Sequence, residues 1–437
     1  MSAVAASPPT RFLRLAGSAL VVLIAPPLYL MLDLAVVGRL GGTEFAALTV
    51  ATLVLAMVST QLTFLAYGTT ARSARAFGAG DRAAAVREGV QAGWIAAGVG
   101  ALIVAVVYPL APSVMRALVP DDDVAAAAAS WVRIAVFGVP PILLSMAGNG
   151  WMRGVQEARR PVRYVTVGLG VSAVLCVVLV HGLAGAPQLG LAGSAVSNLV
   201  GQGLTGGAFV VHLVRESGSG AALRPDWPVM RAQLTMARDL ILRSASFQIC
   251  FVSAAAVAAR FGVAQVAAHQ LVLQLWEFIA LLLDSLAVAA QQLVGAALGA
   301  GAFAAARSDA RRATLLSLGL SGLLAVGFAA GAAVIPRIFT DDAEILAATR
   351  TPWWFLVAML PIAGIVFALD GVLLGAGDVA YLRTATLLGA LGGFLPCIRL
   401  SLVFDWGLAG IWTGLLVFMG ARWAAVGLRV RSGSWVR

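Results

Sequence analysis

Four acidic side chains lie inside long apolar runs of this sequence, where no bulk water can hydrate a carboxylate. Asp33 interrupts PPLYLMLDLAVVG, Asp370 interrupts FALDGVLLG, and Glu277 and Asp284 lie seven residues apart in QLWEFIALLLDSLAV. A charge in hydrocarbon costs at least about 2.5 kcal/mol, so it normally faces a bundle interior or a wet cavity. Such a carboxylate can alternate between a protonated state and a cation-bound state.

The composition around these acids is that of a membrane protein. Of 437 residues, 60% are hydrophobic and only 11% are charged, against roughly 25% charged residues in soluble domains. A window of about twenty apolar residues crosses a hydrocarbon core of about 30 Å. We therefore expect an all-α membrane protein with twelve transmembrane helices, near residues 15–37, 46–69, 90–111, 128–147, 165–184, 189–213, 239–258, 266–292, 314–335, 352–375, 384–404 and 408–427.

The basic residues predict the orientation of these helices. All 30 are arginines spread over the loops, so the net charge of +10 does not indicate a nucleic-acid partner. With an inner N-terminus, 22 arginines fall inside, seven fall outside, and Arg243 lies near a helix start. This excess predicts an inner (cytoplasmic) membrane protein with both termini in the cytoplasm. Arg11 and Arg14 precede the first apolar window, as basic residues do in a signal peptide. No small-residue cleavage site follows the window, so we expect this segment to be retained as the first helix.

The sequence also repeats itself, with a nearly constant offset between its two halves. Such an offset over several blocks indicates a duplicated structural unit. One matched pair places Asn149 of GNGWMRGVQE opposite Asp370 of LDGVLLGAGD. The matched blocks are 38–50 with 259–271, 76–84 with 297–305, 148–157 with 369–378, and 190–193 with 407–410.

Each half of the chain contains six windows, an even number, so both halves enter the membrane from the same side and the repeat is parallel. We expect an N-lobe at 1–214 (helices 1–6) and a C-lobe at 232–437 (helices 7–12). The polar, Gly- and Pro-containing stretch at 215–231 is the expected cytoplasmic linker. Two such lobes favour transport by alternating access over a static channel or a duplicated membrane enzyme.

Polar residues form one stripe on the predicted eighth helix. Gln270, Gln274, Glu277, Asp284 and Gln291 recur at spacings of four, three, seven and seven residues, which keeps them on one helical face. Two carboxylates on this face could contact a cationic substrate or protons. The alternative is internal pairing with an arginine, such as Arg243 or Arg260, or with a helix end.

The repeated blocks resemble the multidrug and toxic compound extrusion (MATE) family, and within it the DinF-like branch. The resemblance rests on DLAVVGRLGGTEFAALTVA, GTTARSARAFGAGD, RGVQEARRP, ARFGVAQVAAHQ, AAQQLVGAALGAG and LDGVLLGAGD, in family-like order over nearly the whole chain. It implies two six-helix lobes around a V-shaped central cavity. It also implies export of organic cations or amphipathic compounds, driven by a H⁺ or Na⁺ gradient.

The resemblance also implies roles for single residues. Asp33 matches the family's first-helix Asp, the best-known cation residue. Many members place Asn and Asp four residues apart in the fifth helix to complete a cation site, whereas this sequence offers Ser172 and Cys176. Because Na⁺ prefers several hard oxygen ligands, this departure favours H⁺ coupling, although the coupling site could also have moved.

Further candidates lie in both halves. Asp370 resembles the family's acidic position in the tenth helix and is a candidate substrate or proton residue, with structural hydrogen bonding as the alternative; Asn149 is its repeat partner. His269 stands where the family often has His and could titrate near neutral pH, but a lone His is more often a packing residue. Tyr67 is one of several aromatic residues available for cation contacts in a cavity.

Several function classes are disfavoured. Without any lysine the chain has no phosphate-cradling Gly/Lys loop for ATP, and its three histidines and three cysteines lack metal-site spacing. We expect no enzyme, no cofactor and no metal, and a monomer whose partners are small organic substrates, the coupling ion and the bilayer. The alternative function is a lipid or lipid-linked precursor flippase, or a metabolite exporter, of the same superfamily. A flippase would be expected to have a more basic cavity, whereas the intramembrane charges found here are mostly acidic.

Overall fold

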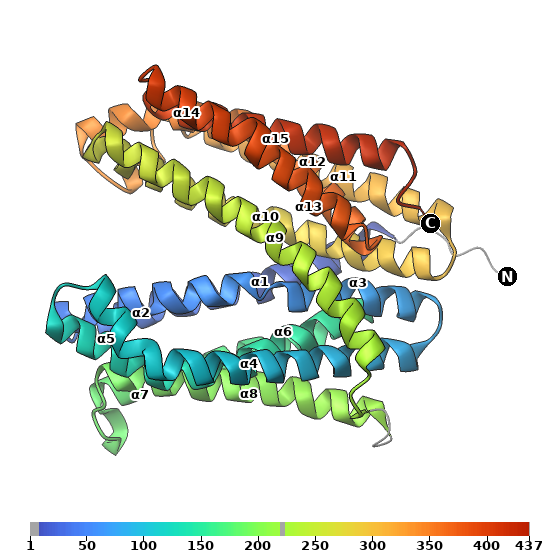
Figure 1. Ribbon diagram of the computed structural model, residues 1–437, viewed down its shortest axis with the longest axis horizontal. Helices are drawn as coiled ribbons and strands as arrows, with labels where there is room; N and C mark the ends of the chain where they lie inside the picture. Colours follow the sequence, from blue (N-terminus) through green and yellow to red (C-terminus); the bar gives the residue numbers. More distant parts are fainter. Residues whose placement is uncertain (1–7, 219–222, 437) are drawn as a thin grey trace. The chain divides into compact units, whose positions relative to one another are not determined.

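The computed structural model describes residues 8–218 and 223–436, apart from the side chains of 57–61. Helix is the only regular secondary structure in the described part (Figure 1). Hydrocarbon offers no hydrogen-bond partners, so each spanning backbone must bond to itself. The α-helices of the first half are α1 (Pro9–Val37), α2 (Gly42–Gln61), α3 (Phe64–Gly78), α4 (Arg82–Leu118), α5 (Asp122–Ala135), α6 (Val139–Gly154), α7 (Arg159–His181) and α8 (Leu191–Ser217). Those of the second half are α9 (Trp227–Ala258), α10 (Val263–Gly299), α11 (Phe303–Ala330), α12 (Ala343–Gly375), α13 (Val379–Leu388), α14 (Leu395–Val403) and α15 (Gly407–Arg431).

Each of the twelve predicted windows overlaps one of twelve helical segments, and the segments extend beyond the windows by as much as twelve residues, as at the start of α9. Three segments are interrupted: α2 is followed by α3, a 3₁₀ turn at Val136–Gly138 joins α5 to α6, and a π-helix at Gly389–Phe394 joins α13 to α14. Among the described residues, ten segments have the length and hydropathy of a membrane span, and Gly42–Ala56 is a shorter apolar helix. With α8 these make twelve, and the predicted all-α membrane fold is confirmed.

The helix boundaries repeat with the offset found in the sequence. α2 begins at Gly42 and α10 at Val263, the position that the repeat pairs with it. α6 and α12 end at Gly154 and Gly375, which are likewise paired. The starts of α4 and α11 have the same spacing. The parallel repeat is therefore a property of the fold as well as of the sequence.

A close helix contact is repeated along with the boundaries. A Cβ atom on Gly150 of α6 would meet the carbonyl oxygen of Ala66 in α3, and one on Gly371 of α12 would meet the carbonyl oxygen of Ala287 in α10. Ala66 and Ala287 are themselves a pair matched by the repeat. Small residues let membrane helices approach until their backbones touch, so both halves are built on the same backbone contact.

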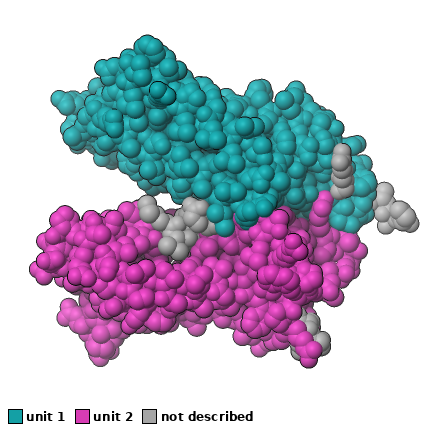
Figure 2. All heavy atoms as spheres, viewed as in Figure 1, with its two compact units in different colours: residues 1–20, 238–437 teal, residues 21–237 magenta. Residues whose placement is uncertain are grey.

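The chain forms two compact units (Figure 2). Unit 2 contains Val21–Ala237, and unit 1 contains Met1–Leu20 together with Arg238–Arg437. The boundaries between the units fall inside α1 and inside α9. The first part of α1, up to Leu20, therefore belongs to unit 1, which is formed mainly by the second half of the chain. The first part of α9, up to Ala237, belongs to unit 2, which is formed mainly by the first half. The lobe boundaries expected from the sequence, with a linker at 215–231, stay a prediction.

Hydrogen bonds from α4 hold the start of α9 within unit 2. Trp94 donates its indole N–H to the carbonyl oxygen of Leu223 over 2.8 Å. Gln91 donates to the carbonyl oxygen of Arg224 over 2.9 Å and accepts from the backbone of Asp226 over 2.8 Å. Gln233 donates to a carboxylate oxygen of Glu88 over 2.7 Å. These bonds fix the end of the predicted linker to α4.

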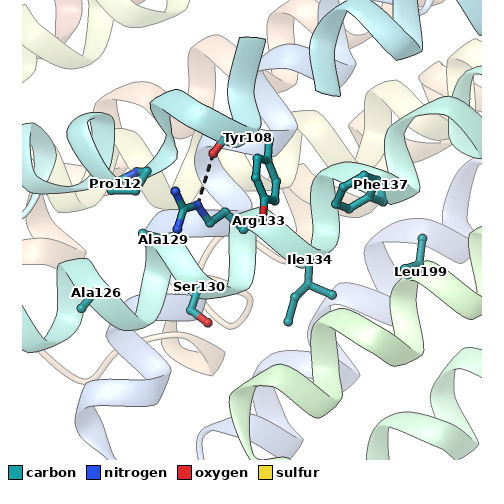
Figure 3. Close-up of a pocket in the computed structure, with 9 residues that line it drawn as sticks. All are labelled: Tyr108, Pro112, Ala126, Ala129, Ser130, Arg133, Ile134, Phe137 and Leu199. Atoms are coloured by element: carbon teal, nitrogen blue, oxygen red, sulfur yellow. Dashed lines mark hydrogen bonds between the residues drawn. The ribbon is translucent and has the colours of Figure 1, made fainter. Parts of the chain in front are cut away.

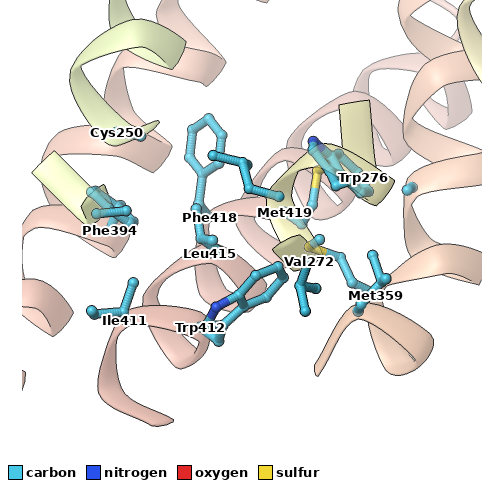
Figure 4. Packing of buried hydrophobic residues seen from close by; sticks show 14 of the residues in the cluster. Cys250, Val272, Trp276, Met359, Phe394, Ile411, Trp412, Leu415, Phe418 and Met419 are labelled. Atoms are coloured by element: carbon cyan, nitrogen blue, oxygen red, sulfur yellow. The ribbon is translucent and has the colours of Figure 1, made fainter. Parts of the chain in front are cut away.

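The core of unit 1 is an aromatic and methionine-rich cluster (Figure 4). Trp276 of α10 and Trp412, Phe418 and Met419 of α15 are all less than 7% exposed. They pack with residues of α9, α12 and α14. Methionine and aromatic side chains fill irregular space between helices, and this cluster fixes α15 against α10.

Substitution of Gly371 by Ala tests the repeated backbone contact. The added Cβ would clash with the backbone of Ala287, so we expect the unfolding temperature in detergent to fall, by an amount equivalent to about 1–3 kcal/mol. Gly322→Ala in α11 is the matched control, because nothing lies within 4 Å of its added Cβ and Ala is the better helix former. Equal unfolding temperatures for the two variants would contradict the contact.

Candidate functional site

Asp33 lies in α1, four residues before the helix ends at Val37, and is only 1% exposed. Its carboxylate accepts two hydrogen bonds within unit 2. The thiol of Cys176 in α7 donates to Oδ1 over 3.2 Å, and the hydroxyl of Ser194 in α8 donates to Oδ2 over 2.9 Å. Three helices therefore meet at one buried carboxylate.

A second layer of hydrogen bonds orients these donors. The indole N–H of Trp131 in α5 donates to Ser194 Oγ over 3.1 Å. Ser197 donates to the carbonyl oxygen of Ser194 over 2.8 Å, and Ser172 donates to the carbonyl oxygen of Ser197 over 2.9 Å. The Tyr29 hydroxyl lies 3.3 Å from Ser197 Oγ. The result is a polar network inside an apolar unit, in which each bond restrains its neighbour.

A glycine brings α7 and α8 close enough to form this network. A Cβ atom on Gly201 would lie 2.5 Å from Ser172 Cβ and 2.7 Å from the carbonyl oxygen of Gly168. Any larger residue would push α8 away from α7. The missing side chain therefore positions the short serine and cysteine side chains within reach of α1.

The charge of Asp33 has no cationic partner in the described part of unit 2, where its hydrogen-bond donors are the neutral Cys176 and Ser194. Among the described residues there is also no group of three or more His, Cys, Asp or Glu that could hold a metal ion. A buried carboxylate in these surroundings can take up a proton or attract a cation. The site is thus suited to reversible charge exchange.

Asp370 in unit 1 has the opposite surroundings. Arg243 of α9 approaches its Oδ2 at 2.5 Å through Nη2, and Nη2 of Arg422 in α15 donates to the same oxygen. Asp370 is 5% exposed and Arg422 is 2% exposed. Asp370 thus has the structural hydrogen bonds that the sequence analysis gave as its alternative, and both donors are arginines. Two arginines thus join the four acids that the sequence analysis found inside apolar windows, because Arg243 lies well inside α9 and Arg422 is buried in α15.

The residues of the polar stripe on α10 differ in their exposure. Gln270, Gln274 and Glu277 are exposed, Asp284 is half-buried, and Gln291 is 1% exposed. Glu277 forms no hydrogen bond or ion pair with another described residue, so the alternative of pairing with Arg243 or Arg260 does not apply to this residue. An exposed carboxylate in the middle of a spanning helix favours a water-filled surface over lipid.

None of the remaining predicted residues is among the hydrogen-bond partners of Asp33 in the described part of the chain. His269 is fully buried in α10 with its ring centroid 5.9 Å from that of Trp412, and its ring nitrogens have no hydrogen-bond partner among the described residues. Asn149 is buried in α6, where its Oδ1 lacks a partner in the described part of the chain. Tyr67 is half-buried in α3. His269 has the packing environment that the sequence analysis gave as its alternative.

A pocket in unit 2 contains none of the predicted site residues (Figure 3). Tyr108, Arg133 and Phe137 line it, with Ser130 and Leu199 also contributing. The Arg133 guanidinium lies 5.2 Å from the centroid of the Tyr108 ring, and its Nε donates to the Tyr108 carbonyl oxygen over 3.3 Å. The Arg133 guanidinium already contacts the ring and the carbonyl oxygen of Tyr108. The residues that line the pocket do not include Asp33 or its two hydrogen-bond donors.

The sequence profile of the MatE family matches residues 19–178 and 240–398, once in each half of the chain. The chain belongs to the MatE family. This match confirms the resemblance found in the motifs and identifies the protein as a MATE multidrug efflux family transporter.

Similar proteins agree with this membership. The chain is 29% identical to Protein DETOXIFICATION 44, chloroplastic, of Arabidopsis thaliana, over 97% of this chain and 82% of the relative. It is also 29% identical to DNA damage-inducible protein F of Escherichia coli (strain K12), over 94% of this chain and 90% of the relative. The crystal structure of MATE in the bent conformation aligns with a TM-score of 0.87 at 20% identity, covering 97% of this chain and 95% of that one. Because the sequence identity to that structure is low, the structural similarity shows a shared fold alone.

Several residues of this MATE transporter's charged sites were missed by the sequence analysis. Ser194 and Ser197 complete the Asp33 network, and the signal was GSAVSN, which places two hydroxyls three residues apart in an apolar run. Arg243 and Arg422 were assigned to helix ends and loops. Their positions inside apolar windows, in LILRSASF and MGARWAAV, were the available signal.

The two buried aspartates are expected to respond oppositely to neutralisation. Asp33→Asn removes an unpaired buried charge and keeps an acceptor oxygen, so the unfolding temperature in detergent should not fall. Asp370→Asn leaves two buried guanidiniums without an acid, so it should cost about 3 kcal/mol or more. A large loss of stability in Asp33→Asn would contradict the description of that carboxylate as unpaired.

Proposed function

We propose that the protein is a secondary active exporter of small organic cations or amphipathic compounds, driven by proton entry. One observation carries the proposal: within a MATE family chain, Asp33 is a buried carboxylate whose hydrogen-bond donors are neutral. The proposed setting is the inner membrane, with both termini in the cytoplasm, a monomeric state and alternating access of two lobes.

The proposed coupling uses two states of Asp33. In the charged state the carboxylate is stabilised only by the Cys176 and Ser194 donors, so it has a net attraction for a proton or an organic cation. In the protonated state the charge disappears, and so does the attraction for the cation. Proton uptake on one side of the membrane therefore releases the cation, and proton loss on the other side restores the site.

The ligands around Asp33 favour H⁺ over Na⁺. Na⁺ is a hard cation that requires several oxygen ligands, whereas one of the two direct neighbours of Asp33 is the soft sulfur of Cys176. Ser172, the other residue at the expected cation-site positions, donates its hydroxyl to the carbonyl oxygen of Ser197. A proton needs no such cage, because the carboxylate alone can hold it.

The exposed stripe of α10 is the proposed contact for the substrate cation. Glu277 offers an unpaired carboxylate, and Gln274, one turn earlier, offers an amide oxygen. Asp284 lies two turns further along the same face. Carboxylates on one helical face attract organic cations without fixing their shape, which suits a transporter of varied substrates.

The first test is efflux of ethidium from proteoliposomes under an imposed pH gradient, with and without Na⁺. The wild type should transport without Na⁺, and Asp33→Asn should lose gradient-driven transport because its side chain cannot exchange a proton. Asp123→Asn is the control, since this exposed acid lies in the first turn of α5.

Each alternative has its own outcome in this assay. Transport that requires Na⁺ would overturn proton coupling. Transport that persists in Asp33→Asn would move the coupling to the carboxylates of the second half. If the wild type does not transport ethidium at all, then lipid, lipid-linked precursor or metabolite substrates become the better explanation.

If the α10 stripe binds the substrate cation, removing its negative charges should weaken binding and adding one should strengthen it. Glu277→Gln combined with Asp284→Asn removes two negative charges without changing side-chain size, and should weaken equilibrium binding of ethidium by about fivefold or more, roughly 1 kcal/mol. Gln274→Glu adds a negative charge to the same face and should strengthen binding. Fluorescence titration of the purified protein measures both, and unchanged affinity in both variants would remove the stripe from substrate binding.

A further inference from the structure

Three charged side chains meet inside unit 1, and their charges do not cancel. Arg243 and Arg422 share a single carboxylate, that of Asp370, and both donate to its Oδ2. The side chains of Arg243, Asp370 and Arg422 are 16%, 7% and 2% exposed. A guanidinium keeps its proton in proteins, so this Arg–Asp–Arg cluster has a net charge of +1.

The described residues supply no second acid to either arginine. Each of the two arginines has Asp370 as its ion-pair partner in the described part of unit 1, and the Nη1 of Arg422 contacts the neutral sulfur of Met419 at 3.6 Å. The Phe247 ring lies 4.6 Å from the guanidinium carbon of Arg422 and 5.6 Å from that of Arg243. Aromatic faces hold a cation in place, but they do not neutralise it.

Two polar atoms of the cluster are also left without a partner. Oδ1 of Asp370 and Nε of Arg243 are buried and form no hydrogen bond with the described residues. Buried polar atoms are nearly always satisfied. An anion placed beside Arg243 would accept from the open Nε donor and would neutralise the excess charge.

The scaffold of the cluster is rigid, and the fold does not require its charges. Gly371, next to Asp370, fixes α12 against the backbone of α10. In the first half of the chain the repeat places Val22, Asn149 and Thr205 at the positions of Arg243, Asp370 and Arg422. All three are buried and uncharged, so the same architecture forms without any ion pair.

We propose that the Arg243–Asp370–Arg422 cluster is an anion-binding site, which takes the carboxylate of a transported amphiphile. This inference rests on the proposed export function and narrows its substrate class: preferred substrates carry an acidic group in addition to a cationic or apolar body. A carboxylate bonded to a guanidinium gains charge-assisted hydrogen bonds, and these are strongest where water is excluded.

Two dyes that differ in one functional group test the proposal. Rhodamine B has a free carboxylate on a cationic ring system, and rhodamine B methyl ester has the same ring system with that carboxylate blocked. Equilibrium binding to the protein in detergent is measured by fluorescence polarisation. We expect the wild type to bind the acid more tightly than the ester.

Substitution of either arginine should remove this preference. Arg422→Gln leaves Asp370 with one arginine and a neutral cluster, and should weaken binding of the acid about tenfold or more, as expected for a lost hydrogen bond to a charged group. Binding of the ester should stay within about twofold. Arg243→Gln should act in the same way, so the test survives if one variant fails to fold. Arg399→Gln, at an exposed position of α14, is the control and should leave both affinities unchanged.

Other outcomes would overturn the proposal. Equal loss of both dyes in the arginine variants would indicate a structural role, and equal affinity of acid and ester in the wild type would exclude a carboxylate site. Displacement of rhodamine B by phosphatidylglycerol vesicles but not by free benzoate would assign the site to a lipid headgroup. Proton-driven efflux of the ester by the wild type, measured in parallel, tests the export function separately, because the binding result does not depend on it.

Discussion

Every charged side chain inside a spanning helix of this protein must be neutralised or hydrated by something other than lipid. The chain meets this constraint in three ways. Asp33 is buried with two neutral donors and can be neutralised by a proton. Asp370 is ion-paired with Arg243 and Arg422, which leaves an excess of one positive charge. Glu277 lies on an exposed face of α10, which favours contact with water over contact with lipid. Each solution gives its carboxylate a different chemistry, although all three are acids in apolar helices.

The duplicated architecture separates scaffold from chemistry. The boundaries of the helices and the contacts of Gly150 and Gly371 recur at a fixed offset, because close backbone packing tolerates little change. The ionisable groups do not recur. Ala254, buried in the core of unit 1, stands at the repeat position of Asp33, and Asn149 stands at that of Asp370. The two halves of this MATE family member therefore share a fold while differing in the charges that they bury.

The sequence predicted the helices and the repeat, and it singled out Asp33 as a candidate residue, because hydropathy and a charge in an apolar run are local signals. It could not place Ser194 beside Asp33, because this contact depends on the tertiary approach of α7 and α8 at Gly201. It also assigned Arg422 to the inner side, because positive charge near a helix end normally marks a loop. Only the packing of α15 against α9 and α12 shows that this arginine is buried and paired.

The assignment of the beginnings of α1 and α9 to opposite units has a consequence for the ancestry of the chain. Each half contributes the first part of its first helix to the unit of the other half, and unit 2 holds its share through the bonds of Trp94, Gln91 and Glu88. Reciprocal exchange of identical elements is the geometry of a domain-swapped dimer. A six-helix ancestor built in this way would have been an obligate pair of identical chains. Fusion of two such chains would produce the assignment found here, in which the two halves can differ in the charges that they bury.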